Sequence, residues 1–225
     1  NWEVKDPRII GVKLTGAPNG WTAPKDVILK LLGILTVKGG TNAIVEYFGP
    51  GAEALSCTGK GTITNMGAEL GATTSIFPYD QRMAAYLKAT GRADLAALAD
   101  ENQDLLCADP EVLADPDDFY DQIIEIDLST LQPHLVGPHS PDIAHPVGRM
   151  ALDTQTEGYP EKLTAALIGS CTNSSYEDIC RATDVARQAK AKGLKMKTSL
   201  WVSPGSDQIY NTIKRDGQLA ALEEG

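Results

Sequence analysis

The sequence has no long apolar run and few basic residues for its length. No stretch approaches the ~18 uncharged apolar residues of a membrane-spanning helix. Lysine and arginine total 20 against 30 acidic residues, which gives a formal charge of -10. This balance argues against general binding to a phosphate backbone, because nonspecific affinity for nucleic acid comes from clustered cations. The polar first residues predict no signal peptide, and the absence of an initiating Met predicts a chain that begins inside a longer one.

Cysteine and histidine are also scarce. The four cysteines are scattered without the Cys-x-x-Cys pairing of many disulfide or metal motifs, which indicates a reducing compartment. They are Cys57, Cys107, Cys171 and Cys180. The three histidines, His134, His139 and His145, all fall in the Pro-rich stretch 132–146. Spacing alone therefore closes no metal site.

The hydrophobic pattern predicts an α/β fold. Residues 8–16 alternate like a strand, and residues 22–37 have the periodicity of a helix, with Thr22 as its N-cap and Pro24 in its first turn. Residues 43–48 read as another strand, so this order predicts a βαβ unit. The same order returns with strands at 163–168 and 199–202, a helix between them and a further helix from near Ser206. We therefore expect parallel or mixed sheets flanked by helices.

Cys171 lies where a predicted strand ends and a predicted helix begins. The strand stops at Gly169, and the helix runs from about Ser175 to Lys192, with Ser174 and Glu177 spaced as a capping box. A helix N-terminus favours an anion, so a thiolate there could act as a metal ligand or a nucleophile. A small buried thiol at the end of a core strand is the alternative, and spacing alone does not decide between them.

Asn65 and Glu69 form a second candidate pair. They are four residues apart in a predicted helix over 62–70, which would place an amide and a carboxylate on one face. Such pairs are usually part of a solvated face, so the spacing by itself favours a structural interpretation.

Two sequence motifs favour a functional interpretation of these residues over a structural one. Residues 169–178 read Gly-Ser-Cys-Thr-Asn-Ser-Ser-Tyr-Glu-Asp, and residues 57–75 contain Asn-Met-Gly-Ala-Glu. Both strongly resemble the aconitase family, iron–sulfur hydro-lyases that interconvert citrate and isocitrate. The resemblance implies that Cys171 is one of three cysteine ligands of a [4Fe–4S] cluster, that Asn65 lies against the cluster, and that Glu69 holds the substrate hydroxyl or water. Lys60 and Thr64 stand where many members carry Met and Cys, and Cys57 matches no ligand, so we interpret it as a structural thiol.

The resemblance extends over essentially the whole chain and implies an internal piece of a larger enzyme. We expect residues 1–10 to be the tail of a preceding domain, 11–131 a second aconitase domain, 132–160 a linker or crossover, and 161–225 the start of a third domain. The remaining cluster ligands would come from a Cys-x-x-Cys beyond this sequence, and most acid, base and substrate-binding groups would also lie outside it. The isolated chain is therefore expected to be inactive.

Three other functions compete with this interpretation. A related hydro-lyase could act on methylcitrate, homocitrate or isopropylmalate, and a cluster-free protein could bind RNA, although the acidic balance disfavours it. A cysteine hydrolase using Cys171 and His145 ranks last. The expected partners are citrate, cis-aconitate, isocitrate and the rest of the protein's own chain, with neither RNA nor a membrane. Bacterial cytoplasm and mitochondrial matrix both fit the reduced cysteines.

Overall fold

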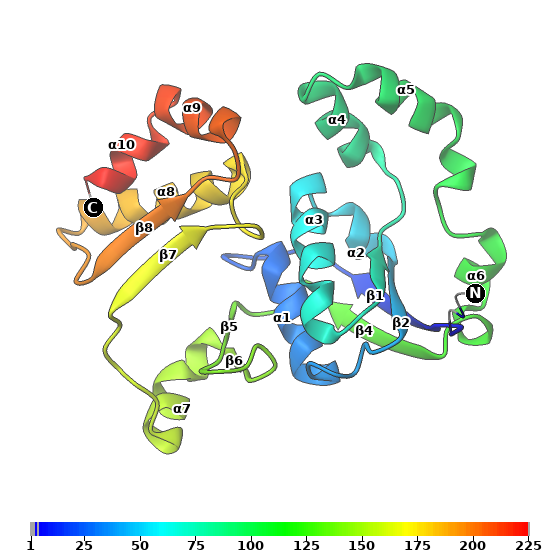
Figure 1. Cartoon of the computed structure of the whole chain (residues 1–225), viewed down its shortest axis with the longest axis horizontal. Helices are drawn as coiled ribbons and strands as arrows, with labels where there is room; N and C mark the ends of the chain where they lie inside the picture. The colour runs from blue at the N-terminus through cyan, green and yellow to red at the C-terminus, as the bar shows by residue number, and fades with distance from the viewer. Residues whose placement is uncertain (1–2, 4, 225) are drawn as a thin grey trace. The chain divides into compact units, whose positions relative to one another are not determined.

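The computed structural model describes Glu3 and residues 5–224, and the chain divides into two compact units between Glu157 and Gly158. The first unit holds most of the helices and strands, and the second is a smaller α/β unit (Figure 1). Each unit is described by itself.

A four-stranded parallel sheet forms the centre of the first unit. Its strands are β1 (Arg8–Thr15), β2 (Ala43–Phe48), β3 (Thr74–Ile76) and β4 (Gln122–Asp127), in the order β3-β2-β1-β4. Val12 of β1 lies opposite Tyr47 of β2 on one side and Ile124 of β4 on the other. The predicted βαβ unit is confirmed, with all neighbouring strands parallel.

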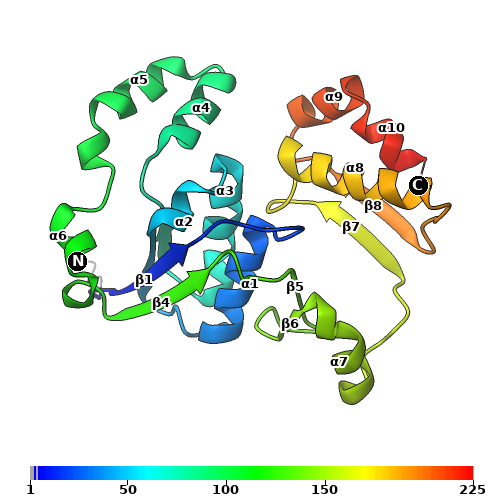
Figure 2. The ribbon, with the colours of Figure 1, turned by 180° about the vertical axis from the view of Figure 1, so that it is seen from behind.

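Two helices cover one face of this sheet. They are α1 (Pro24–Leu35), between β1 and β2, and α3 (Cys57–Asn65), between β2 and β3, preceded by the short α2 (Pro50–Glu53) (Figure 2). Alternate strand residues meet these helices in one apolar core, which includes Ile10, Tyr47 and Ile124. Because both connections cross the same face, the strand order runs steadily from β1 to β3.

The start of α1 differs from the sequence prediction. Its N-cap is Ala23, whose N–H donates to the Asp26 carboxylate at 2.7 Å. Thr22, the predicted cap, instead donates its hydroxyl to the Leu131 carbonyl at 2.7 Å. The prediction of a Thr22 cap was therefore wrong, because a residue more than a hundred positions away takes its side chain.

The rest of the first unit follows β3 in two groups. The first group is α4 (Gln81–Ala89), α5 (Ala93–Glu101), η2 (Gln103–Leu105), α6 (Pro110–Ala114) and η3 (Pro116–Asp118), all before β4. The second is an antiparallel hairpin of β5 (His134–Val136) and β6 (Ala144–Pro146), then η4 (Val147–Arg149) and α7 (Met150–Glu157). Residues 8–10, expected in a tail, thus lie in β1, and most of the expected linker is folded within the first unit.

The second unit repeats the strand–helix order on a smaller scale. Parallel strands β7 (Ala165–Gly169) and β8 (Ser199–Ser203) are joined by α8 (Tyr176–Ala191) and followed by α9 (Asp207–Arg215) and α10 (Gln218–Glu223). Ile179, Ile213 and Leu222 form its buried core, with Ile168 and Val202 packed against them. Ser206 caps α9 as predicted, since its hydroxyl accepts the Ile209 N–H at 3.1 Å.

Candidate functional site

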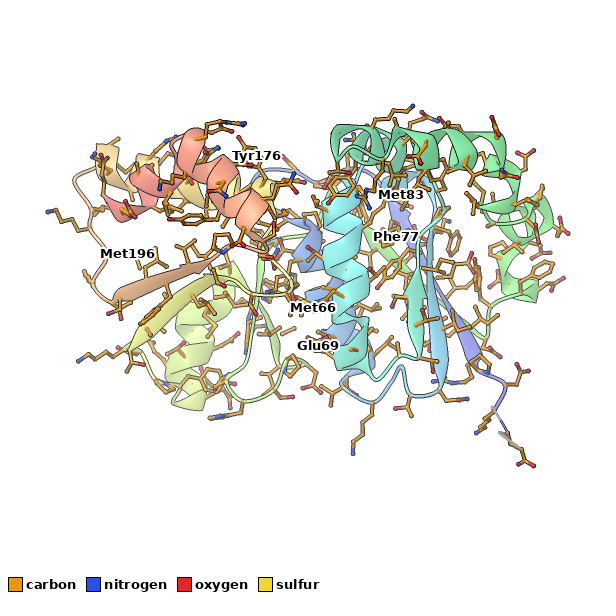
Figure 3. The ribbon with its side chains drawn as sticks, turned by 45° about the horizontal axis from the view of Figure 1, so that its top comes forward. Met66, Glu69, Phe77, Met83, Tyr176 and Met196 are labelled. Atoms are coloured by element: carbon orange, nitrogen blue, oxygen red, sulfur yellow. The ribbon has the colours of Figure 1, made fainter. Side chains whose placement is uncertain are left out.

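The segment that carries Asn65 and Glu69 is two helices rather than one. α3 already begins at Cys57, with Ser56 as its N-cap, and ends at Asn65; a 3₁₀ helix, η1 (Met66–Leu70), then carries Glu69. Residues four apart are offset by about 40° in an α-helix but by about 120° in a 3₁₀ helix. The single predicted helix, with both side chains on one face, was therefore wrong. Asn65 is exposed and Glu69 is half-buried. Figure 3 shows Glu69 at the end of this segment, beside Met66.

The backbone around Glu69 is held from both sides. Leu70 is fully buried, and its carbonyl accepts the Gly40 N–H at 2.9 Å. A Cβ added at Gly67 would lie 2.3 Å from the Ser75 hydroxyl, so a larger residue would displace this side chain where η1 approaches β3. The Ala72 N–H also donates to the Gly67 carbonyl at 3.2 Å. Glu69 therefore sits on a short, rigid segment between packed residues.

Glu69 lies away from a cavity at one edge of this sheet. That cavity, of about 690 Å³, lies beyond the carboxyl end of β2 and is lined by Gly49, Lys60 and Asp80 among others. The Glu69 segment is bonded instead to Gly40, which precedes β2, and so lies toward the opposite edge of the sheet. The carboxyl edge, where open parallel sheets usually bind ligands, is thus a separate region from the segment named by the motif.

Lys60 anchors the other end of α3. Its ammonium forms an ion pair with the Asp80 carboxylate, and the two side chains are only 3% and 17% exposed. The ammonium also lies 5.8 Å from the centre of the Phe77 ring. Burial raises the pKa of the nearby Cys57 thiol, although Lys60 opposes this rise, so the site disfavours a thiolate at Cys57.

Cys171 is presented by a tight turn at the end of β7. Gly169 has a φ of 120° and Ser170 a φ of 71°, both in regions that L side chains rarely adopt. A Cβ at Gly169 would lie 1.9 Å from the Ser203 carbonyl oxygen, so the turn requires glycine there. Cys171 is exposed, and its Sγ lies 3.6 Å from the Thr172 hydroxyl.

The helix beyond Cys171 begins one residue later than predicted. Ser175, not Ser174, is the N-cap of α8: its hydroxyl accepts the Asp178 N–H at 3.2 Å, and its own N–H donates to the Asp178 carboxylate at 3.1 Å. Asn173 donates its amide N–H to the same carboxylate at 3.0 Å. Ser174 is buried, and its carbonyl accepts the Gly205 N–H at 3.1 Å. The capping box therefore uses Asp178, because packing against the loop after β8 occupies Ser174.

Comparison with known proteins identifies the family. The family model described as the aconitase family (aconitate hydratase) matches residues 1–225. The chain is 56% identical to the mitochondrial aconitate hydratase of Schizosaccharomyces pombe over 99% of its own length, and 56% identical to that of Gracilaria gracilis. It is 54% identical to that of Saccharomyces cerevisiae, again over 99% of the chain.

The chain belongs to the aconitase family. It spans 28% of the length of these curated relatives. The recognition made from the two motifs is therefore confirmed, as is the α/β fold with a parallel sheet flanked by helices. The structure places Asn65 and Glu69 on one segment of the first unit. Cys171 lies in the second unit.

Cys171 and its surroundings fit the role of one ligand to the iron–sulfur cluster that the aconitase family implies. Cys171 offers an exposed sulfur just before a helix N-terminus, where negative charge is favoured. Asn173, two residues on, has a buried side-chain oxygen with no hydrogen-bond partner, which leaves an acceptor for a group from outside the described residues. Within the described part of the chain no three His, Cys, Asp or Glu side chains gather to hold a metal, and none of the four cysteines is in a disulfide.

His145 is engaged in a different interaction from the one a cysteine hydrolase would need. Its Nδ1 lies 2.7 Å from the Asp153 carboxylate and its Nε2 lies 3.2 Å from the Gly137 carbonyl. Both ring nitrogens thus face oxygens of the first unit that only accept hydrogen bonds. This geometry disfavours His145 as a base for the Cys171 thiol.

Sequence reasoning did not find the distant side chains that hold the segments carrying the predicted site residues. Nothing local connects Lys60 with Asp80, because the pair joins two helices across β3. The capping role of Asp178 was visible in principle, since Ser175 and Asp178 are also spaced three apart. Choosing between the two overlapping boxes required knowing that Ser174 is buried.

Proposed function

We propose that this chain is part of an aconitate hydratase that interconverts citrate and isocitrate through cis-aconitate. The observation that carries the proposal is the Gly169–Ser170 turn, which presents Cys171 before a capped helix in a chain of the aconitase family. The rigid η1 segment with Glu69 supports it from the first unit. Activity of the whole enzyme would require parts of the protein beyond the 28% represented here.

Each named residue has a defined task in this proposal. Cys171 would supply one thiolate of a [4Fe–4S] cluster, and Asn65 would orient the cluster's surroundings through its amide. The cluster, when bound, supplies a Lewis-acidic iron for removal and addition of water. Glu69 would accept a hydrogen bond from the substrate hydroxyl or water and fix its direction. Its carboxylate can do so because η1 is packed on both sides.

The substrate and the compartment follow the same proposal. Citrate, cis-aconitate and isocitrate are the proposed substrates, and the rest of the protein's own chain is the proposed partner of both units. The relatives are mitochondrial aconitate hydratases, which makes the mitochondrial matrix the proposed compartment, with bacterial cytoplasm as the alternative. No helix in the described residues is both long and apolar enough to cross a bilayer.

The test is turnover by the intact, cluster-loaded enzyme that contains this sequence. We expect ultraviolet absorbance to show cis-aconitate forming from isocitrate and citrate faster than the products formed from methylcitrate, homocitrate or isopropylmalate. Glu69→Gln should lower kcat roughly a hundredfold, because an amide orients the hydroxyl or water less well than a carboxylate. Glu53→Gln, an exposed change on α2, is the matched control and should leave turnover unchanged. Preference for another hydroxy acid would contradict the proposed substrate, and full activity in Glu69→Gln would contradict the role of Glu69.

A further inference from the structure

A loop after α8 combines positive charge with exposed apolar side chains. We call residues 192–197, Lys-Gly-Leu-Lys-Met-Lys, the basic loop. All six residues are exposed, and Leu194 and Met196 are 59% and 48% exposed. Met196 lies at the opposite end of the second unit from Tyr176, which begins α8 (Figure 3). The basic loop contains no carboxylate.

The start of β7 adds to the same surface. Ala165 pairs with Ser199, which brings the residues before β7 beside the residues before β8. Lys162 and Leu163 accordingly line one shallow hollow together with Met196 and Lys197. Leu163 is 67% exposed. The basic loop, Lys162 and Leu163 therefore form one patch of four lysines and three apolar side chains.

The charge of this patch is largely uncompensated within the described part of the chain. The ion pairs of the second unit use other cations: Arg187 with Asp184, Lys190 with Glu224, and Arg215 with Asp216. Glu161, next to Lys162 in sequence, is exposed, and Glu224, which pairs with Lys190, lies near the start of the basic loop. Four lysines against these two carboxylates, one of them already paired, leave a local excess of positive charge.

The apolar side chains of the patch have no role in the core of the unit. That core is formed by Ile179, Ile213 and Leu222, with Ile168 and Val202 against them. Exposed apolar groups between lysines match a lipid interface, where cations meet headgroups and apolar tips enter the acyl boundary. A nucleic-acid backbone would use the lysines but not the apolar groups, and the patch has no arginine or aromatic ring to contact bases.

We propose that the basic loop, together with Lys162 and Leu163, docks this protein on a lipid surface rich in anionic headgroups. Leu194 and Met196 enter the interface while the lysines contact the headgroups. This is a surface contact and does not involve a spanning helix. The sequence predicted no membrane partner because it has no long apolar run, and a six-residue loop gives no such signal.

The test measures sedimentation of the intact enzyme with vesicles at low ionic strength. One set of vesicles is phosphatidylcholine, and the other is an equal mixture of phosphatidylcholine and phosphatidylserine. We expect binding to the mixed vesicles only, weakened by added salt. Changing Lys192, Lys195 and Lys197 to Gln together should weaken binding on the order of 100-fold, from about fivefold for each lysine.

A matched control separates the patch from total charge. Replacing Lys5, Lys30 and Lys38 with Gln removes the same charge from exposed positions in the first unit and should leave vesicle binding within about twofold of the parent. Equal loss in both triple variants would overturn the proposal, because overall charge would then explain the binding. So would absence of binding to the mixed vesicles. Isocitrate turnover by each variant checks that it is folded and should be unchanged.

A second variant tests the apolar contribution. Leu194→Ser with Met196→Ser keeps every charge and should weaken vesicle binding roughly tenfold. If this variant binds vesicles like the parent, while the patch lysine variant loses binding to a DNA duplex, the surface is a nucleic-acid site and the lipid proposal is wrong.

Discussion

The buried ion pair between Lys60 and Asp80 makes a quantitative prediction about stability. Lys60→Met keeps most of the side-chain volume but removes the ammonium that faces the Asp80 carboxylate. The other carboxylate oxygen still accepts the N–H groups of Arg82 and Met83, at 3.1 and 3.0 Å, so Asp80 keeps its role as the cap of α4. Breaking a buried pair from one side typically costs ~3–5 kcal/mol. Because the capping bonds are retained, we expect Lys60→Met to lower the free energy of unfolding by about 3 kcal/mol, the low end of this range.

A double-mutant cycle isolates the pair itself. Asp80→Asn keeps an acceptor for the cap but leaves the Lys60 ammonium buried, so it should also cost about 3 kcal/mol. The double variant removes both charges and should recover at least about 2 kcal/mol of the summed loss. Urea unfolding followed by circular dichroism gives each free energy of unfolding.

The chain offers an exposed pair for comparison. Lys13 and Glu125 lie 3.7 Å apart with side chains 42% and 58% exposed, so the same cycle there should give a coupling of no more than about 0.5 kcal/mol. Couplings of equal size at the two pairs would refute the argument that burial makes the Lys60 pair strong.

Two further predictions concern backbone and pH. Gly169→Ala would bring a Cβ to 1.9 Å from the Ser203 carbonyl oxygen at a φ of 120°, so we expect a loss on the order of 3 kcal/mol. Gly193→Ala, with a φ of 69° and no atom within 4 Å, should cost only about 1 kcal/mol, and equal thermal unfolding of the two variants would contradict this. The hydrogen bond from His145 is the main cause that lowers the pKa of Asp153 in the folded state. This carboxylate stabilises the fold above the ordinary Asp pKa, and the stabilisation is lost as pH falls through the lowered pKa. From about pH 4 downward, the stability of Asp153→Asn should therefore fall less steeply with pH than that of the parent. An unchanged slope in acid titrations would contradict this.

Regular elements with their own periodic signals were predictable from the sequence. The strands β1, β2, β7 and β8 and the helix α8 fall within a few residues of the expected ranges. The predicted end of that helix at Lys192 is its C-cap, and Gly193 follows it with a φ of 69°. These features depend on local alternation, periodicity and glycine chemistry, which a sequence displays directly.

Features that depend on distant partners were not predictable. Thr22 has the side chain of a good N-cap, but the Leu131 carbonyl takes its hydroxyl. The expected helix through Glu69 changes to a 3₁₀ helix because Gly67 packs closely on Ser75 and Leu70 is bonded to Gly40. The hairpin of β5 and β6 was not predicted in the Pro-rich stretch, because three-residue strands carry almost no periodic signal.

The role of the two motif residues rests on family resemblance more than on local geometry. Spacing alone favoured a solvated face for Glu69 and left Cys171 open between ligand and structural thiol. The structure adds that Cys171 is exposed on a turn that requires Gly169. Exposure at that turn is what a ligand to a shared cluster requires, and a buried structural thiol would not need it.

Cluster content of the Cys171→Ser enzyme tests the central claim most directly. The intact enzyme is prepared with Cys171→Ser and, as a control, with Cys180→Ser, which changes a half-buried thiol on α8 whose Sγ lies 3.3 Å from the Gln218 amide nitrogen. Iron per chain and visible absorbance are measured together. We predict that Cys171→Ser loses the cluster signal and most of its iron, while Cys180→Ser keeps both. A Cys171→Ser enzyme with the iron content and absorbance of the parent would contradict the account.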